Sequence, residues 1–203
     1  MMNLKKSFFI KEEKGALSIE FAAVFFGFIL IIFLVYDVYT TIALQNKLDR
    51  STYSASTIFR QRPLFFKGNK YIEEINKQQV DDLQHLLSSM MADKAIQLRV
   101  DLLTVKSNQS MPNDITSAHK TVTTVCSTTG CNSAYFSKLP DLSTYHNLTV
   151  YSKLNRWIPL YRISACMSNS DSLYTGLASI VSNINELCTS SIVISRCTGN
   201  CSY

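Results

Sequence analysis

The sequence predicts an α+β fold in which one long N-terminal helix, apolar in its first half, packs on an antiparallel sheet domain. Three observations predict this fold. Residues 16–36 are apolar with a single charge, residues 37–62 place apolar side chains at helical spacing, and short runs rich in β-branched residues occupy the second half of the chain. Helical and strand-like segments that are grouped separately along a chain are typical of α+β architecture.

The apolar run is long enough to cross a membrane. The stretch ALSIEFAAVFFGFILIIFLVY, Ala16 to Tyr36, carries Glu20 as its only charge, and about 20 apolar residues span a bilayer as a helix. A secretory signal peptide has a shorter apolar core and small residues at a cleavage site, which residues 33–37 lack. We therefore expect the segment to stay in the protein.

Lysines before the apolar run predict its orientation. The flank of residues 1–15 is rich in them: Lys5, Lys6, Lys11 and Lys14. Because lysine and arginine are in excess on cytoplasmic sides, this end is expected in the cytoplasm. Everything after Asp37 then lies on the opposite side.

The residues after the membrane segment are expected to continue the same helix. Leu44, Leu48, Ala55 and Phe59 fall on one face at helical spacing, and neither Gly nor Pro interrupts residues 37–62. This pattern predicts an amphipathic extension, ending near Pro63, with one face free to pack on a domain.

Residues 63–203 are expected to form one α+β domain on the side of the membrane opposite the cytoplasm. Apolar residues at helical spacing predict a helix over 70–97 and another over 172–187. Runs rich in Val, Ile, Thr and Tyr predict strands over 98–105, 121–126, 148–153, 161–167 and 191–196. The strands would form an antiparallel sheet on the long helix.

The cysteines predict disulfides. All six lie in the last third of the chain, on the side expected outside the cytoplasm: Cys126, Cys131, Cys166, Cys188, Cys197 and Cys201. Six cysteines allow many pairings. Spacing favours Cys126 with Cys131 and Cys197 with Cys201, which leaves Cys166 with Cys188. A zinc site is the weaker reading, because the pairs are not CxxC and the histidines His85, His119 and His146 are scattered; we expect no metal and no cofactor.

No pattern in the sequence names an enzymatic chemistry. It contains no GxSxG, HExxH, phosphate-binding glycine loop or nucleotide fingerprint, and the net charge of +5 is dispersed, which names no nucleic-acid partner. Asp81 and Asp82 are expected on a solvated helix face, His119 and His146 on the surface, and Trp157 and Tyr161 in the core. We therefore expect a protein that is not an enzyme.

Glu20 is the unusual residue of the apolar run. A carboxylate at the bilayer centre costs about 2.5 to 3.5 kcal/mol, so one that persists usually has a partner and a role. One interpretation is that Glu20, close to the helix end, extends to the headgroups. However, Ala16, Glu20, Ala23 and Gly27 fall on one face, and small residues let membrane helices approach closely. This face predicts helix-to-helix assembly.

The order of residues around Gly15 resembles the type III signal of type IV pilins and pseudopilins. A charged leader ends in Gly15, and Glu20 is the fifth residue after it. The resemblance implies that a prepilin peptidase cuts between Gly15 and Ala16 and leaves the helix attached to the mature protein. The new amino group would then lie close to Glu20 and supply its counter-charge.

Three further stretches narrow the resemblance. LDRSTYSASTIFRQR (48–62), RWIPLYRISAC (156–166) and SSIVISR (190–196) resemble the TadE/TadF-like minor pilins of the tight adherence (Tad, or Flp) pilus system, and TadF more than TadE. This implies a pilin-like, low-abundance subunit that supports assembly of Flp pili for attachment and biofilm formation.

The resemblance also implies location and partners. The protein would cross the inner membrane once, with its N-terminus cytoplasmic and its C-terminal domain periplasmic, and a place in the extracellular pilus stays open. Its partners would be other pilins and minor pilins, the prepilin peptidase, an inner-membrane assembly platform, a cytoplasmic ATPase and an outer-membrane secretin. The alternative is a periplasmic enzyme or binding protein tethered by an uncleaved signal anchor, for which Gly15 and Glu20 would have no use.

Overall fold

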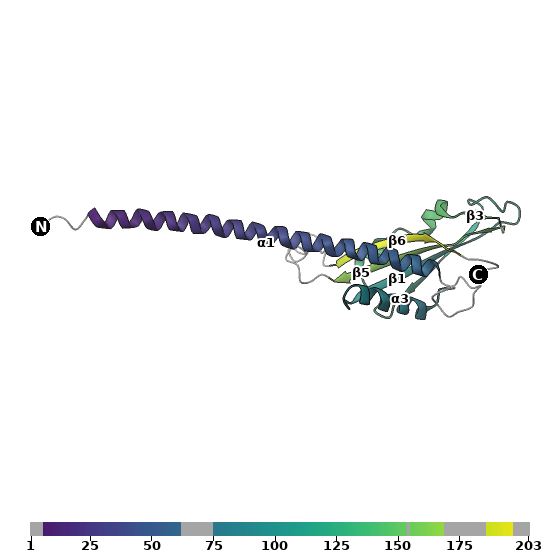
Figure 1. The fold of residues 1–203 in the computed structure, drawn as a ribbon. Coiled ribbons are helices and arrows are strands. Elements are labelled where there is room, and N and C mark those ends of the chain that lie inside the picture. Colours follow the sequence, from purple (N-terminus) through teal and green to yellow (C-terminus); the bar gives the residue numbers. More distant parts are fainter. Residues whose placement is uncertain (1–5, 62–74, 154, 169–185, 197–203) are drawn as a thin grey trace.

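The computed structural model describes residues 6–61, 75–153, 155–168 and 186–196, and for residues 6–18 it describes the backbone alone. In these ranges the protein consists of a rod-like helix with an α+β head around its C-terminal half (Figure 1). The predicted fold class is confirmed: a long N-terminal apolar helix packs on an antiparallel sheet.

The rod is a single helix, α1, which covers Lys6–Arg60. Its 55 residues correspond to about 80 Å at 1.5 Å per residue. It is continuous because the chain has no proline before Pro63. The membrane segment and its amphipathic extension are therefore parts of one helix, as predicted, although this helix begins earlier than expected and ends two residues sooner.

The head is built on four antiparallel strands in the order β2-β1-β5-β6. β1 covers Ile96–Lys106, β2 His119–Cys126, β5 Leu160–Ser168 and β6 Glu186–Ile194. Asp101 of β1 lies opposite Arg162 of β5 and Thr124 of β2. A separate two-stranded sheet joins β3 (Tyr151–Ser152) to β4 (Arg156–Trp157).

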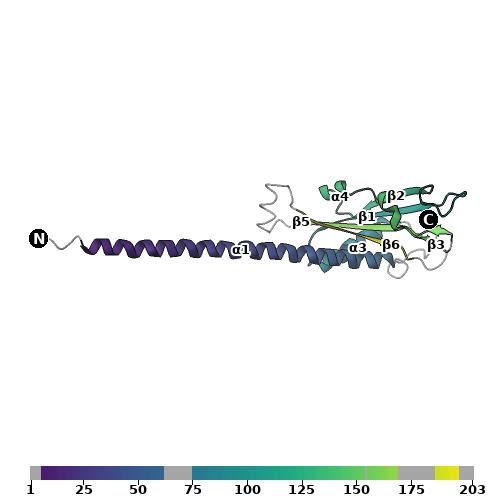
Figure 2. The ribbon, with the colours of Figure 1, turned by 90° about the horizontal axis from the view of Figure 1, so that it is seen from above.

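One face of the sheet packs on α1 and on α3, which covers Lys77–Met90 (Figure 2). Successive side chains of a strand point to opposite faces, so β1 places Leu98, Val100 and Leu102 in the main core with Leu48, Ala55 and Phe59 of α1. The Phe59 and Tyr161 rings pack in a T-shaped arrangement, with 5.2 Å between their centroids. The predicted apolar face of the extension is thus the face that packs.

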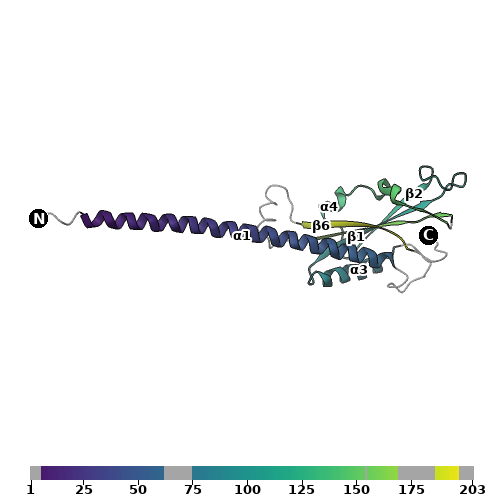
Figure 3. The same ribbon diagram turned by 45° about the horizontal axis from the view of Figure 1, so that its top comes forward.

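The opposite face is covered by two short helical segments, α4 (Ala134–Lys138) and η1 (Leu142–Leu148), which lie across the sheet from α1 (Figure 3). A smaller apolar cluster forms here from Leu103, Leu142, Trp157 and Leu160, among others. The sheet is therefore buried on both sides near its centre.

The helix predicted over 70–97 is shorter in the structure. Residues 70–74 lie outside the described ranges, and α3 begins after Asn76, whose side chain accepts a hydrogen bond from the backbone of Gln78 in a capping box with Gln79. The prediction was wrong at the other end: Ala92 and Asp93 adopt positive φ angles of 57° and 58°, which a right-handed helix cannot continue, and β1 begins at Ile96.

Two other boundaries differ from the sequence prediction. The strand expected over 148–153 is mostly absent, because Leu148 ends η1 and only Tyr151–Ser152 pairs, with β4. The helix expected over 172–187 falls largely outside the described ranges, but its last two residues belong to β6, which begins at Glu186 instead of Ser191 and ends at Ile194. Pairing with β5 from Ser168 onward accounts for the earlier start.

Candidate functional site

The first half of α1 projects from the head with its large apolar side chains exposed. Phe21 is 74% exposed and Phe33 61%, and the most apolar window of the helix has a mean hydropathy of 2.6 with none of it buried. Burial of apolar surface away from water is favourable by about 25 cal/mol per Å². Among the described residues, α1 is the one helix that is long and apolar enough to span a membrane, consistent with a membrane-anchored protein.

Glu20 lies on this projecting half, between the exposed Ile19 and Phe21. Its side chain is exposed, and no hydrogen bond or ion pair links it to any described residue. Within the described chain the carboxylate therefore has no counter-charge.

The small residues predicted to share the face of Glu20 are open to the surroundings. Ala23 is exposed, and a Cβ added at Gly27 would meet no atom within 4 Å. The backbones of Gly15 and Ala16 belong to α1, whereas the exposure of these two residues falls outside the description. On the described part of this face, nothing from the same chain blocks the approach of another helix.

α1 enters the head at Thr41, the first of its described residues that is less than a tenth exposed. One turn later the Gln45 side chain donates a hydrogen bond to the Cys188 carbonyl of β6, at 3.1 Å. Further along, the Ser56 hydroxyl donates to the hydroxyl of Ser191 at 3.0 Å. The helix is thus held to β6 by polar contacts as well as by its apolar face.

Two of the three expected disulfides are present: one favoured by spacing and the one that remained after the spacing-based pairs. Cys126 is bonded to Cys131, and Cys166 to Cys188; Cys197 and Cys201 lie outside the described ranges. The Cys166 and Cys188 sulfurs and the Glu186 carboxylate lie within 4.8 Å of one another. Metal sites use the thiolate, and both sulfurs here are joined in a disulfide, so the arrangement offers no such ligands.

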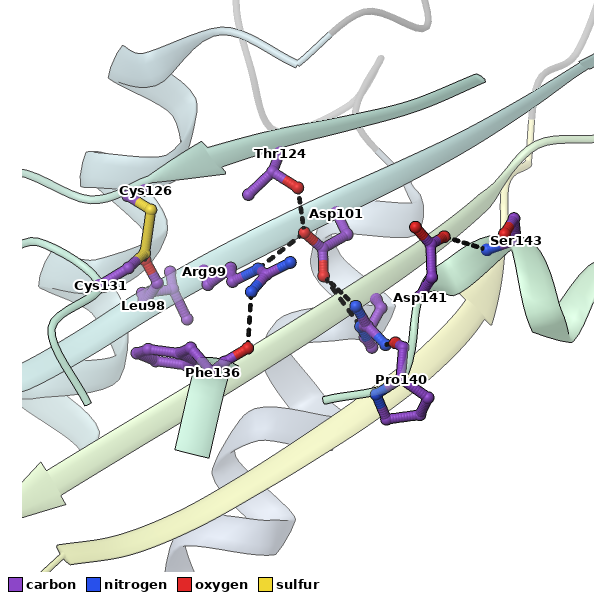
Figure 4. Close-up of polar contacts among 11 residues, drawn as sticks. Leu98, Arg99, Asp101, Thr124, Cys126, Cys131, Phe136, Pro140, Asp141 and Ser143 are labelled. Atoms are coloured by element: carbon purple, nitrogen blue, oxygen red, sulfur yellow. Dashed lines mark hydrogen bonds and ion pairs between the residues drawn. A yellow bond between two sulfur atoms is a disulfide. The ribbon is translucent and has the colours of Figure 1, made fainter. Parts of the chain in front are cut away.

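A buried charge network at the centre of the sheet was not predicted from the sequence (Figure 4). Asp101 is fully buried and its two carboxylate oxygens accept four hydrogen bonds: from Arg99 Nε and Thr124 Oγ1 on one oxygen, and from Arg162 Nε and Nη2 on the other. With both oxygens occupied by donors from β1, β2 and β5, the carboxylate is a structural group of the sheet.

The same network connects the sheet to the segment that covers this face, which runs from α4 to η1. Arg99 donates to the Phe136 carbonyl at 2.8 Å, and Arg162 donates to the Pro140 carbonyl at 2.5 Å. The neighbouring Asp141 accepts from the backbone N–H of Ser143 at 2.8 Å, which, with the Arg162 and Arg99 charges nearby, lowers the pKa of its carboxyl below 3.8. In the sequence, the one signal for this network was the presence of opposite charges in two predicted strands. Only the register between β1 and β5 shows that these charges meet.

Asp81 has a structural partner. It accepts hydrogen bonds from the backbone and the hydroxyl of Thr128, at 2.6 and 2.8 Å, and so links α3 to the loop closed by Cys126 and Cys131. Burial acts to raise the pKa of this carboxyl, but the Thr128 hydrogen bonds outweigh it, with help from the charges of Lys77 and His85, and the pKa lies below 3.8.

The remaining candidates occupy ordinary positions. Asp82 and His119 are exposed, whereas His146 is half-buried, with its Nδ1 2.8 Å from the Ser143 carbonyl. Trp157 and Tyr161 are buried, which confirms their assignment to the core. An open groove of about 310 Å³ beside α1 is lined by Ala43, Asn46, Lys47, Arg50, Ser51, Ser54 and Met90, a set without a carboxylate, histidine or cysteine.

Comparison with known proteins identifies one family. The family model TadF, described as "Putative tight adherence pilin protein F", matches residues 8–196, which is most of the chain. The comparisons with curated proteins and with solved structures found no match. The matched range includes α1 from Phe8 onward and every described strand of the head.

Proposed function

Because the chain belongs to the TadF family of tight adherence pilin proteins, we propose that it is a minor pilin or pseudopilin that supports assembly of Flp-type pili for surface attachment and biofilm formation. Residues 1–15 are the leader, a prepilin peptidase cuts between Gly15 and Ala16, and residues 16–36 anchor the product in the inner membrane. The head, residues 63–203, lies in the periplasm.

The observation that carries this proposal concerns Glu20. This carboxylate has no counter-charge among the described residues, and it lies on an apolar helix whose side chains are exposed. Glu20 makes no contact with a charged group of the described chain, and Gly27 on the same face meets no atom within 4 Å. A single charge in lipid is costly, whereas the amino group created at Ala16, of the same or a neighbouring chain, would neutralise it. Small residues on the same face would allow helices of other pilins to pack closely.

The hydrogen bonds made by Asp101 and Asp81 support a role in assembly more than a role in catalysis. The buried Asp101 is saturated with hydrogen bonds, and Asp81 is held by Thr128. In the described part of the head, these contacts of charged groups hold helices, strands and loops together. We therefore propose a structural subunit whose partners are other pilins and minor pilins, the prepilin peptidase and the inner-membrane platform.

The proposal is tested by substituting Glu20 with valine in cells that have an active prepilin peptidase. We expect Glu20→Val to be inserted and cleaved to a product that begins at Ala16, because the change favours lipid and lies five residues after the cut. Pilus formation and surface attachment should be lost, since the new ammonium would enter the helix bundle unpaired. Intact-mass measurement checks cleavage, and electron microscopy of sheared fibres checks assembly.

The matched control is Ile19→Val, a change of the neighbouring exposed residue that leaves the charge untouched. It should be cleaved and should form pili as the natural chain does. Normal pili from fully cleaved Glu20→Val, or a natural protein that keeps its leader, would each refute the proposed role.

A further inference from the structure

The disulfide between Cys166 and Cys188 lies where the rod meets the head. The two cysteines are directly opposite each other in the β5–β6 ladder. The carbonyl of Cys188 itself accepts the hydrogen bond from Gln45, one turn after α1 becomes buried at Thr41. The covalent link between the strands and a polar link to the helix therefore share one residue, Cys188.

β6 is the element through which this disulfide acts on α1. Among the described strands it lies at the edge of the four-stranded sheet, paired there with β5. α1 contacts β6 at the entry point through Gln45 and deeper in the head through Ser56 and Ser191. Strand ends open locally at low free-energy cost, so an unlinked end of β6 would release the helix at its entry point first.

We propose that the Cys166–Cys188 disulfide is a redox-sensitive lock that fixes the direction in which α1 leaves the head. When the bond is closed, β6 is held on β5 and the Cys188 carbonyl keeps Gln45 in place. When it is reduced, the head stays folded on its apolar core, while the start of β6 opens and α1 gains freedom to swing. The lock is a property of the single chain and goes beyond the assembly role proposed above.

The opening step is thiol–disulfide exchange with a small thiol. Cys166 is 2% exposed, whereas Cys188 is half-buried, so the attacking thiolate reaches Cys188 Sγ. A mixed disulfide forms there, and Cys166 leaves as a thiolate that takes a proton from water. A second thiolate releases Cys188 as a thiol, and the two reductant molecules end as one disulfide; two electrons pass to the protein.

Glu186 makes the Cys166–Cys188 disulfide harder for anionic thiols to reduce. It lies two residues before Cys188 on β6, hence on the same face, and its carboxylate is within 4.8 Å of both sulfurs. An approaching thiolate is negatively charged and is repelled at this distance. Glu186 therefore slows reduction by anionic thiols.

The second described disulfide provides a matched control. Cys126–Cys131 closes a short loop after β2, at the opposite edge of the sheet, and the nearby Thr128 is held by Asp81 of α3. Its loss should loosen that loop and leave the direction of α1 unchanged.

The test measures the distance between α1 and the sheet in the full-length protein in detergent micelles. Spin labels carried by non-natural amino acids replace two exposed residues, Tyr39 on α1 and Lys106 at the end of β1. Cys166→Ser with Cys188→Ser should broaden the distance distribution, whereas Cys126→Ser with Cys131→Ser should leave it as narrow as in the natural chain. Equal widths in all three proteins, or equal broadening in both variants, would overturn the proposal.

Two further measurements cover a variant that fails to fold. In the Cys126→Ser, Cys131→Ser background, dithiothreitol added to folded protein should broaden the distribution, and reoxidation should narrow it again; a distribution that ignores full reduction of Cys166 and Cys188 contradicts the lock. Glu186→Gln should speed reduction by glutathione about fourfold, the factor expected for repulsion between unit charges at this distance in water. Uncharged tris(hydroxypropyl)phosphine should reduce both proteins at one rate, and equal rates with glutathione would remove Glu186 from the mechanism.

Discussion

At Asp101, one buried carboxylate faces two guanidinium groups. Arg162 is 2% exposed and Arg99 keeps 22% of its side chain in solvent, so most of the cost of removing charges from water falls on Asp101 and Arg162. Such pairs add little net stability over apolar residues of the same size, but loss of one partner leaves the other charge buried. Because both arginines also bind carbonyls of the covering segment, the network selects which segment lies on this face.

Asp101→Leu should therefore be among the most destabilising single changes in the head. We expect a loss of about 3 to 5 kcal/mol in the free energy of unfolding, because Arg162 stays buried without its carboxylate. Combining Asp101→Leu with Arg162→Met should recover part of that loss, and chemical denaturation followed by circular dichroism measures both. Losses that simply add in the double variant would contradict the pairing, since contacting residues are expected to couple.

Asp81 predicts an acid-sensitive contact between α3 and the loop at Thr128. Its pKa is below 3.8 in the folded protein, so the stability that it contributes is complete above the ordinary pKa and is lost as pH falls through the folded value. Asp81→Asn should lower stability at pH 7 and should flatten the decline below about pH 4.

Thermal unfolding measured from pH 7 to about pH 2 tests this sign, over the range in which carboxyl groups take up protons. Asp82→Asn is the control, because this exposed neighbour accepts no hydrogen bond from the described residues. If Asp82→Asn flattened the acid decline as much as Asp81→Asn, the effect would belong to general charge and not to the Thr128 contact.

At the scale of elements, α1 is one helix whose two halves have different surroundings. Its first half presents apolar side chains on all sides, as a helix in lipid does, and its second half buries one stripe in the head. Leu48, Ala55 and Phe59 are fully buried, whereas Tyr53 is 62% exposed on the same segment. The change from all-round to one-sided apolarity separates a half that is apolar enough to span a membrane from a half that packs on the sheet.

Phe59→Ala tests how strongly the second half holds the head. The ring packs against Tyr161 in a T-shaped arrangement and is fully buried, so we expect a loss of about 3 to 5 kcal/mol in unfolding free energy. Tyr53→Ala removes an exposed aromatic ring from the same helix and should change stability by less than about 0.5 kcal/mol. Denaturant unfolding compares the two, and similar losses would show that burial in the head is not the cause.

The whole molecule is a rod attached to a head, and the rod is exposed where it would lie in a membrane or among other helices (Figure 1). Stability of the head and association of the rod are therefore separable. Residues such as Phe59 and Asp101 act within one chain. Glu20, Ala23 and Gly27 contact no described part of their own head, and their effects should appear only between chains.

Gly27→Leu distinguishes these two levels. Because a Cβ at Gly27 meets open space in the single chain, unfolding of the head should be unchanged. If the face of Glu20 and Gly27 packs against another helix, a leucine there keeps the backbones apart and pilus formation should fall sharply. Ala22→Leu adds the same kind of bulk on a different face of the helix and should be tolerated; equal effects of the two changes would contradict a specific packing face.

The amino-acid sequence by itself determined the features that depend on local spacing. The apolar run, the absence of proline before Pro63 and the stripe from Leu44 to Phe59 specify α1, because helix formation depends on neighbours a few residues away. Cys126 and Cys131 could be paired for the same reason, since only a short loop separates them. The positions of β1, β2 and β5 followed from their β-branched runs.

Only the tertiary structure decided which distant residues meet. The β1–β5 register brings Asp101 to Arg162, and the β5–β6 register sets Cys166 opposite Cys188 beside Gln45. Strand pairing fixes such contacts along the whole length of two strands, and a shift by one residue would move every side chain to the other face. That choice depends on which face is buried by α1 and α3, which is a property of the assembled core and not of any single segment.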